Sequence, residues 1–251
     1  MRETLFKKLL IANRGEIAIR IARAASELRI ATVAIYSADD ATSLHVRKAD
    51  EAHAIGRVGA AAYLDIERII AIANETGCDA IHPGYGFLSE NVALARRTAE
   101  EGLTFVGPST EALQLFGDKI AARRLAAKSG VPVIEGTVGE TSLEDAQAFF
   151  SKLNGGAMMI KAVSGGGGRG MRAVRNADEI GQAYARCRSE AKAAFGDGAV
   201  YVERLVEDAR HIEVQIVGDR SGAVRHFGER ECTIQRRNQK LIEIAPSPSL
   251  S

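Results

Sequence analysis

Short apolar runs alternate with amphipathic stretches through the first 106 residues, and this alternation restricts the possible folds more than any other feature. Alternating and apolar runs predict strands over residues 8–12, 31–36, 52–55, 80–81 and 103–106. Helical periodicity predicts helices from about residue 14 to 28, over 66–75 and over 89–101. A strand–helix–strand rhythm of this kind predicts an α/β fold with a doubly wound parallel sheet and helices on both faces.

The pattern changes after a helical connector, expected over residues 109–116 and 120–128 and ended by Gly130, Val131 and Pro132. Beyond it the periodicity predicts helices over 143–153 and 178–195 and strands over 158–160, 171–174, 200–204, 211–217 and 223–229. We therefore expect a small α+β module over residues 133–204, followed by the first strands of another sheet.

The segment SGGGGRG, residues 164–170, lies inside the expected hairpin of strands 158–160 and 171–174. Bare glycine N–H groups can converge on anionic oxygens without interference from a Cβ. Lys161 and Arg169 add positive charge beside the run, so we interpret the loop as a phosphate cradle. A flexible hairpin tip is the simpler alternative, although so long a loop exceeds what a hairpin needs. The residues match neither a Walker loop nor a dinucleotide-binding GxGxxG turn.

Composition excludes several functional classes. The chain carries 33 Lys and Arg against 32 Asp and Glu, so it lacks the excess of cations that a nucleic-acid-binding face needs. We find no apolar run of membrane-spanning length and no secretory signal pattern. Cys78, Cys187 and Cys232 are widely spaced, which predicts free structural cysteines in a reducing compartment.

Residues 211–216, HIEVQI, alternate strictly, so His211, Glu213 and Gln215 share one face of the expected strand. For Glu213 and Gln215 we favour a solvated face of an antiparallel sheet, and for His211 a structural and a functional role stay open. The donor-rich segment 235–240, QRRNQK, is either a solvated surface or a site for phosphate or bicarbonate oxygens.

Other candidate positions lie where expected elements begin or end. Asp118 is expected to cap a helix, and Lys119 at the positive end of its dipole calls for an anionic partner. Residues 82–91 and 13–16 follow the carboxyl ends of two expected strands, where open α/β sheets bind ligands. In these segments Ser89 is a candidate helix cap, Gly84 and Gly86 are candidate turn residues, and either segment could shape a pocket or only a turn.

Six segments together give a family resemblance: IANRGEIAIRI, HPGYGFLSEN, GDK, IKAVSGGGGRGMR, HIEVQI and ERECTIQRRNQK. The chain resembles the biotin carboxylase component of biotin-dependent carboxylases, in the ATP-grasp superfamily, over its whole length. The resemblance implies a domain of residues 1–116, a connector of 117–132, an ATP-grasp lid of 133–204 and the first catalytic-domain strands over 205–251. In this reading the glycine segment belongs to a mobile lid over ATP.

The resemblance also implies a reaction. ATP phosphorylates bicarbonate to carboxyphosphate, with Mg²⁺, and the carboxyl group passes to biotin on a carrier. The implied partners are a biotin carboxyl carrier and a carboxyltransferase, with homodimer formation through the N-terminal domain and a cytoplasmic or mitochondrial-matrix location. No nucleic-acid or membrane partner is implied. An acyl-CoA, pyruvate or urea acceptor is not distinguished.

Motif position assigns the ATP-binding residues. Lys119 and Lys161 would contact ATP, Gly165, Gly166, Gly167, Gly168, Arg169 and Gly170 would close over the phosphates, and Glu203, Arg204 and Val206 would meet adenine. His211 would approach the ribose, and Gln235 and Lys240 would lie near phosphate and bicarbonate. Asn238 stands where many members have His, which leaves a hydrogen-bonding contact but no acid–base role.

The family's magnesium-binding glutamates, catalytic base and bicarbonate-binding arginines are expected beyond Ser251, so we expect no metal ligand in these residues, no carboxylation by this chain alone and weak nucleotide binding. An incomplete sheet would also expose apolar surface. Two alternatives remain: another ATP-grasp ligase, such as the carbamoyl-phosphate synthase large chain, and a non-catalytic dimerisation module.

Overall fold

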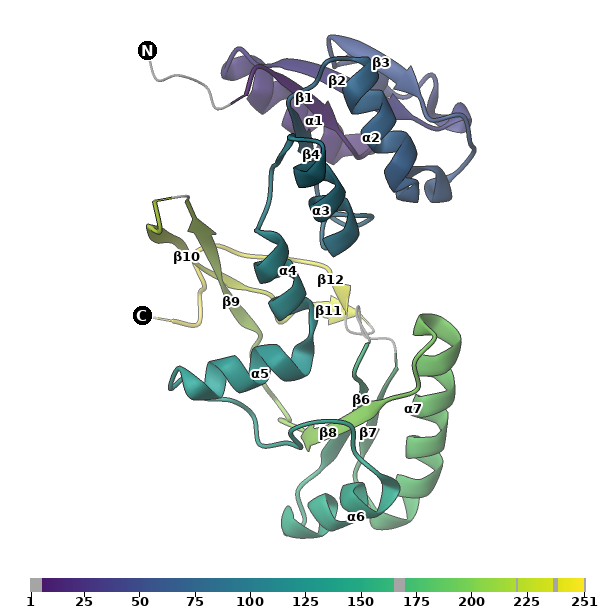
Figure 1. Ribbon diagram of the computed structural model, residues 1–251. Helices are drawn as coiled ribbons and strands as arrows, with labels where there is room; N and C mark the ends of the chain where they lie inside the picture. The colour runs from purple at the N-terminus through teal and green to yellow at the C-terminus, as the bar shows by residue number, and fades with distance from the viewer. Residues whose placement is uncertain (1–5, 165–169, 220, 237–238, 251) are drawn as a thin grey trace. The chain divides into compact units, whose positions relative to one another are not determined.

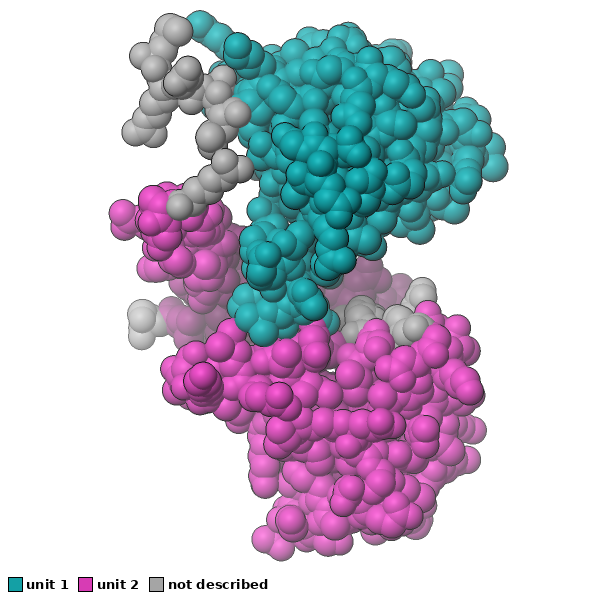
Figure 2. Space-filling model, in the orientation of Figure 1, with its two compact units in different colours: residues 1–117 teal, residues 118–251 magenta. Residues whose placement is uncertain are grey.

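The computed structural model describes residues 6–164, 170–219, 221–236 and 239–250. The chain divides into two compact units, residues 1–117 and 118–251, which are coloured separately in Figure 2. Figure 1 labels most of the helices and strands of both units. Each unit has its own buried apolar residues, and each is described by itself below.

The first unit contains a five-stranded sheet in the order β3-β2-β1-β4-β5, and every neighbouring pair is parallel. Its strands are β1 (Lys8–Ile11), β2 (Ala31–Tyr36), β3 (Glu51–Ala54), β4 (Ala80–His82) and β5 (Thr104–Phe105). The chain leaves β1 toward β2 on one side and returns to place β4 on the other. This arrangement confirms the expected doubly wound parallel sheet.

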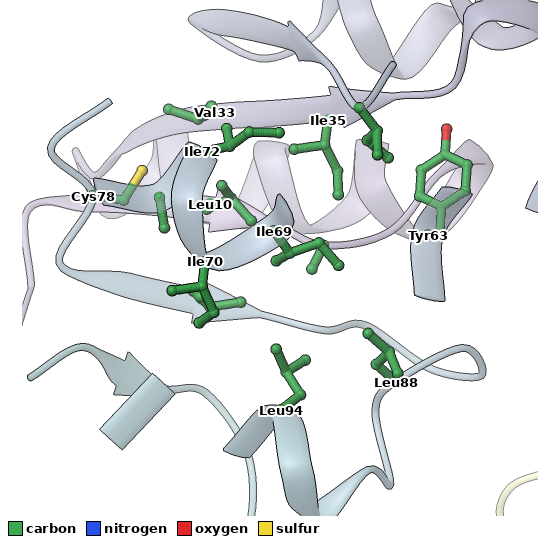
Figure 3. Packing of buried hydrophobic residues seen from close by; sticks show 14 of the residues in the cluster. Leu10, Val33, Ile35, Tyr63, Ile69, Ile70, Ile72, Cys78, Leu88 and Leu94 are labelled. Carbon is green, nitrogen blue, oxygen red and sulfur yellow. The ribbon is translucent and has the colours of Figure 1, made fainter. Parts of the chain in front are cut away.

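Helices cover both faces of this sheet. Neighbouring residues of β1 accordingly belong to two different apolar clusters, one on each face. Leu9 and Ile11 pack with the inner face of α1 (Gly15–Glu27), whereas Leu10 packs with α2 (Ile66–Glu75). Figure 3 shows the second cluster, in which side chains of α2 meet those of β1 and β2. The period-two alternation of a strand buried on both faces explains why apolar residues are continuous there.

The remaining helices of the first unit are α3 (Val92–Glu100), α4 (Thr110–Gly117) and the 3-10 turns η1 (Ala38–Asp40), η2 (Leu44–Arg47) and η3 (Ala60–Leu64). The expected cap at Ser89 is wrong. Asn91 caps α3, because its side chain accepts a hydrogen bond of 3.0 Å from the N–H of Leu94. Ser89 instead donates its N–H to Gly86 in a turn.

The second unit begins with α5 (Lys119–Lys128), and Asp118 caps it as expected by accepting from the N–H groups of Ile120 and Ala121. An antiparallel sheet follows, ordered β7-β6-β8, with α6 and α7 packed against it. Its elements are β6 (Met158–Ala162), β7 (Met171–Val174), β8 (Val200–Arg204), α6 (Leu143–Lys152) and α7 (Ile180–Phe195), with the 3-10 turn η4 (Ala177–Glu179) before α7.

Two further antiparallel pairs complete the unit: β9 (Ile212–Gly218) with β10 (Val224–Glu231), and β11 (Gln235–Arg236) with β12 (Gln239–Lys240). The expectation of a solvated polar face on β9 is wrong for Glu213, whose side chain is only 23% exposed. Val214 and Ile216 on the other face are 52% and 53% exposed, in line with the expected exposure of apolar surface.

Candidate functional site

A cleft of about 680 Å³ in the second unit brings together residues from its three described sheets. Its walls come from β6, from β8 and the segment that follows it, and from the start of β9. Among the lining residues are six that the sequence singled out: Lys161, Glu203, Arg204, Val206, His211 and Gln235. The structure therefore places the two ends of the predicted site in one cavity, although they are far apart in the sequence.

Strand alternation directs the β6 side chains. Met158, Ile160 and Ala162 are buried, and the first two pack in the core beneath α6 and α7. The intervening Met159 and Lys161 point to the opposite face and line the cleft. β6 therefore presents one apolar and one cationic side chain to the cavity.

Glu203 is the charged centre of the cleft, and its side chain is 6% exposed. One carboxylate oxygen accepts from Lys161 of the neighbouring strand. The other accepts from Nη1 of Arg123 on α5 at 3.2 Å. A buried carboxylate of this kind is stable only when its charge is paired, and two cations pair it here.

Lys119 adds a third cation to this group. Burial lowers the pKa of its ammonium, the charge of Lys161 lowers it further, and Glu203 opposes the effect. Two cations therefore pair the carboxylate, and the charge of a third, Lys119, interacts with Glu203 and Lys161. An excess of partly buried positive charge suits the binding of a polyanion such as a phosphate chain.

Two residues of this site were missed by the sequence reasoning, Arg123 and Gly136. Arg123 lies one helical turn after Lys119, and that spacing is a signal that could have found it. Gly136 pairs with Glu203 in an isolated β-bridge. A Cβ at Gly136 would lie 2.7 Å from the carbonyl oxygen of Val202, and local sequence gives no sign of this close approach.

His211 and Gln235 meet at the other side of the cleft. Nε2 of Gln235 lies 2.7 Å from Nδ1 of His211 and also donates to the carbonyl oxygen of Cys232 at 2.9 Å. Because the amide nitrogen is a donor, the imidazole accepts at Nδ1 and carries its hydrogen at Nε2. The structure places His211 on the cleft wall, and its functional role stays a prediction.

Lys240 is not a lining residue of this cleft but part of an ion-pair network around Glu213. Arg230 binds the same carboxylate, with Nε 2.9 Å from Oε1. The hydrogen bonds of Lys240, and then those of Arg230, lower the pKa of Glu213 to about 2. The carboxylate of Glu213 therefore binds one cation from β10 and one from β12.

Within the described residues, one group of potential metal ligands is close enough to share an ion, namely Glu213, Cys232 and Glu243. The pairing of Glu213 with Arg230 and Lys240 does not fit a cation site, since its oxygens already bind positive charge. The oxygens of Glu203 likewise already bind cations, Lys161 and Arg123. The described part of the cleft therefore offers no free carboxylate for Mg²⁺.

Some predicted residues lie outside the described part of the chain, namely Gly165, Gly166, Gly167, Gly168, Arg169 and Asn238. Gly170 is described, with a φ of +66° that favours glycine. Its carbonyl oxygen accepts from the N–H of Ala162 at 2.8 Å and from Sγ of Cys187 at 2.9 Å. These bonds fix the backbone where the glycine segment rejoins the sheet.

The two segments singled out in the first unit shape a second, smaller pocket of about 360 Å³. Asn13 is buried at the end of β1 and donates to the carbonyl oxygens of Pro83 and Tyr85, at 2.7 and 2.9 Å. Gly84 and Gly86 have φ values of +66° and +64°, which confirms them as turn residues. The pocket lies at the carboxyl ends of β1 and β4, where the sheet changes direction.

Two lining residues of this pocket, Arg14 and Phe87, contact a polar network that includes the buried Asp40 and Tyr63. Asp40, at the end of η1, is 4% exposed and binds Arg14 through both carboxylate oxygens, at 2.5 and 2.6 Å. Tyr63 donates to the same carboxylate at 2.8 Å, and its ring stacks on Phe87 with centroids 5.3 Å apart. Because of these contacts the β1–α1 turn and the 83–87 turn are held together.

The three cysteines are free and buried, as the sequence predicted. Among the described residues, no helix is both long enough and apolar enough to cross a membrane.

Comparisons with known proteins identify the family of both units. Residues 5–113 match the family described as biotin carboxylase, N-terminal domain, and residues 118–251 match that described as carbamoyl-phosphate synthase L chain, ATP binding domain. Pyruvate carboxylase of Bacillus subtilis is 56% identical over 253 residues, and the human mitochondrial pyruvate carboxylase is 52% identical over 247 residues. These alignments take in 100% and 97% of this chain but 22% and 21% of those proteins.

Solved structures give the same result. The biotin carboxylase domain dimer of Hydrogenobacter thermophilus 2-oxoglutarate carboxylase, in complex with MgADP, ADP and bicarbonate, has a TM-score of 0.94 and 48% identity. Biotin carboxylase of Campylobacter jejuni in a β,γ-ATP complex has a TM-score of 0.95 and 45% identity. The chain is covered to 99% and 98%, and it spans 55% of each of those chains. The chain therefore belongs to the biotin carboxylase family of ATP-grasp proteins.

Proposed function

We propose that the cleft of the second unit is the ATP site of an ATP-dependent biotin carboxylase. The observation that carries the proposal is Glu203 paired by Lys161 and Arg123. Glu203 and Lys161 line a cleft that also has apolar lining residues, among them Met159 and Leu205. Such a cavity suits a ligand with a flat apolar part and a polyanionic part. Relatives of similar sequence have been solved with ADP or an ATP analogue.

Individual roles are proposed from motif position in the family, with the cleft as support for the residues that line it. Lys161 and Lys119 bind phosphate oxygens, with Gly165, Gly166, Gly167, Gly168, Arg169 and Gly170 covering them. Glu203, Arg204 and Val206 meet the adenine, partly through backbone groups, since β8 ends there. His211 binds the ribose, Gln235 and Asn238 contact the phosphates, and Lys240 with Gln235 approaches bicarbonate. The location of Lys240 outside the cleft makes its contact the one with least support.

The domain boundaries belong to the same proposal. Residues 1–116 form the N-terminal α/β domain, 117–132 the connector, 133–204 the lid and 205–251 the first strands of the catalytic domain. The division of the compact units between Gly117 and Asp118 supports the first boundary. The separate sheet β7-β6-β8 supports the lid.

The activity of the whole protein is phosphorylation of bicarbonate by ATP and transfer of the carboxyl group from carboxyphosphate to biotin. The proposal includes a biotin carrier and a carboxyltransferase as partners, homodimer formation, and a cytoplasmic or mitochondrial-matrix location. Similarity to pyruvate carboxylases over nearly the whole chain supports it. That the chain alone does not carboxylate biotin, and binds nucleotide weakly, stays a prediction.

A carbamoyl-phosphate synthase role has less support. The second unit matches an ATP-binding domain named for that enzyme, and the same fold serves both chemistries. The first unit, in contrast, matches a biotin carboxylase domain, and the HPGYGFLSEN segment lies there.

Calorimetric titration of the purified chain with ADP and ATP tests the nucleotide site. We expect saturable binding that Lys161→Gln weakens by about tenfold or more, since a charge-assisted contact to phosphate is lost. Lys128→Gln, at the opposite end of α5, removes the same charge from an exposed position and serves as the control. No binding by the wild-type chain, or equal loss in both variants, would refute the assignment.

A further inference from the structure

Arg123 connects three parts of the second unit. It lies on α5, donates through Nη1 to Glu203 on β8, and donates through Nη2 to the backbone oxygen of Ile134 at 2.5 Å. Its side chain is 24% exposed. The guanidinium fork therefore reaches a carboxylate and a carbonyl at once, a geometry that the point charge of a lysine does not reproduce.

The two oxygens of Glu203 are divided between two cations. Oε1 accepts from Lys161 and Oε2 accepts from Arg123. Since the carboxylate of Glu203 is nearly buried, its rotation away from Arg123 would leave Oε2 unpaired unless another cation bound it. Lys119 is close enough to Glu203 and Lys161 for both charges to affect its pKa.

We propose that Arg123 is a positioning residue for phosphate binding. It holds Oε2 of Glu203, so that this carboxylate pairs with Lys161 through Oε1 alone and is not free to turn further toward Lys161 or Lys119. The inference rests on the proposed nucleotide site, which it extends by a residue that does not itself touch the nucleotide. The carboxylate charge is then shared between Arg123 and Lys161, and the ligand meets lysines that Glu203 neutralises only in part.

This role concerns the phosphates alone. If Arg123 is lost, Glu203 competes with the ligand for the lysines, so a nucleoside triphosphate is bound less well. Adenosine has no phosphate and meets only the base and ribose parts of the cleft. A general distortion of the cleft would instead weaken both ligands, because Ile134 also lines the cavity.

The experiment compares ATP with adenosine in competition binding to the wild-type chain and three variants. We expect Arg123→Gln to reduce ATP affinity by about tenfold and adenosine affinity by less than about twofold. Arg124→Gln removes the same charge from the exposed neighbouring position and should match the wild type. Arg123→Lys should recover part of the ATP affinity, since it restores a cation but not the fork. Equal losses for ATP and adenosine would overturn the proposal, as would an effect of Arg124→Gln as large as that of Arg123→Gln.

A second measurement needs no ligand. The acylation rate of Lys119 by an amine-reactive reagent, followed by mass spectrometry at constant pH, reports the fraction of neutral amine. Arg123→Gln should slow it by about threefold or more relative to Arg124→Gln, because Glu203 then stabilises the ammonium. An unchanged rate would overturn the proposal. If wild type binds no nucleotide, the proposed function fails, and the acylation rate still decides whether Arg123 restrains Glu203.

Discussion

The backbone of Gly84 passes directly against the side chain of Asn13, so that a Cβ at Gly84 would lie 2.7 Å from Nδ2 of Asn13. The same nitrogen donates to the carbonyl oxygens of Pro83 and Tyr85. The close approach therefore joins the turn after β4 to the end of β1. It requires glycine twice, once for the contact and once for the positive φ.

Gly84→Ala is predicted to destabilise the first unit by about 2–4 kcal/mol, because the left-handed backbone adds about 1–2 kcal/mol and displacement of Asn13 leaves buried polar groups unpaired. Gly86→Ala is the matched control, since its φ is +64° and a Cβ there would meet nothing within 4 Å. Gly86→Ala should lower the free energy of unfolding by the backbone contribution alone. Urea unfolding measures both, and equal losses would show that the contact with Asn13 contributes nothing.

Gly136→Ala is predicted to weaken nucleotide binding by about tenfold, because a Cβ would lie 2.9 Å from Cβ of Glu203 and 3.1 Å from Nη2 of Arg123. Displacement of these groups disturbs the charge cluster. Gly139→Ala lies in the same segment with nothing within 4 Å of the added Cβ and should bind like wild type. Calorimetry with ADP decides, and the prediction fails if the two variants bind alike.

Asp40→Asn is predicted to lower the free energy of unfolding of the first unit by about 2 kcal/mol at neutral pH. Buried ion pairs lose about 3–5 kcal/mol when one partner is removed, and less is expected here because Arg14 is 45% exposed. The Arg14 hydrogen bonds hold the pKa of Asp40 well below its ordinary 3.8. A lowered pKa stabilises the fold above the unfolded value, and this contribution is lost as the pH falls below about 4.

Stability of wild type and variant, measured by urea unfolding between neutral and acidic pH, should therefore converge at low pH. Glu27→Gln, which removes an exposed carboxylate of α1, should follow the wild type throughout. A constant gap between wild type and Asp40→Asn at every pH would contradict the assignment to charge.

Glu213→Gln is predicted to destabilise the second unit by about 1–2 kcal/mol at neutral pH, since Arg230 and Lys240 both lose their shared carboxylate. In the wild type this contribution is present above the ordinary pKa of 4.5 and declines as the pH falls toward about 2.

Glu243→Gln provides the comparison, because Glu243 is 44% exposed and lies 3.5 Å from the same Arg230. It should change stability by about 0.5 kcal/mol or less. Thermal unfolding at two pH values separates the variants. A larger loss of stability in Glu243→Gln than in Glu213→Gln would show that Glu213 is not the central carboxylate of this network.

Local periodicity was sufficient for much of the fold. The strands over residues 31–36 and 200–204 and the helix over 66–75 have the bounds that the sequence predicts. Helix α3 begins three residues later than expected. Both Ser89 and Asn91 are residue types that suit a helix cap, but Ser89 is in a turn in which its N–H donates to the carbonyl oxygen of Gly86, and Asn91 caps the helix. Strand β5 is shorter than the predicted strand over residues 103–106, because only Thr104 and Phe105 pair with β4.

The candidate site divides in the same way. Lys119 and Lys161 lie in motif segments, and the family resemblance proposed Glu203 from its position in the chain. Arg123 and Gly136 have no such motif. The first acts through a carboxylate 80 residues away, and the second through a backbone contact with β8.

The sequence by itself determined the types of element, the two-faced parallel sheet and the family, since these depend on periodicity and on local motifs. Only the tertiary structure decided which charges meet. Glu203 is shared by Lys161 and Arg123, and Lys240 is paired with Glu213 instead of facing the cleft. The physical reason is that a buried carboxylate needs cationic partners at hydrogen-bonding distance, and strand pairing and helix packing select them from positions far apart in the chain.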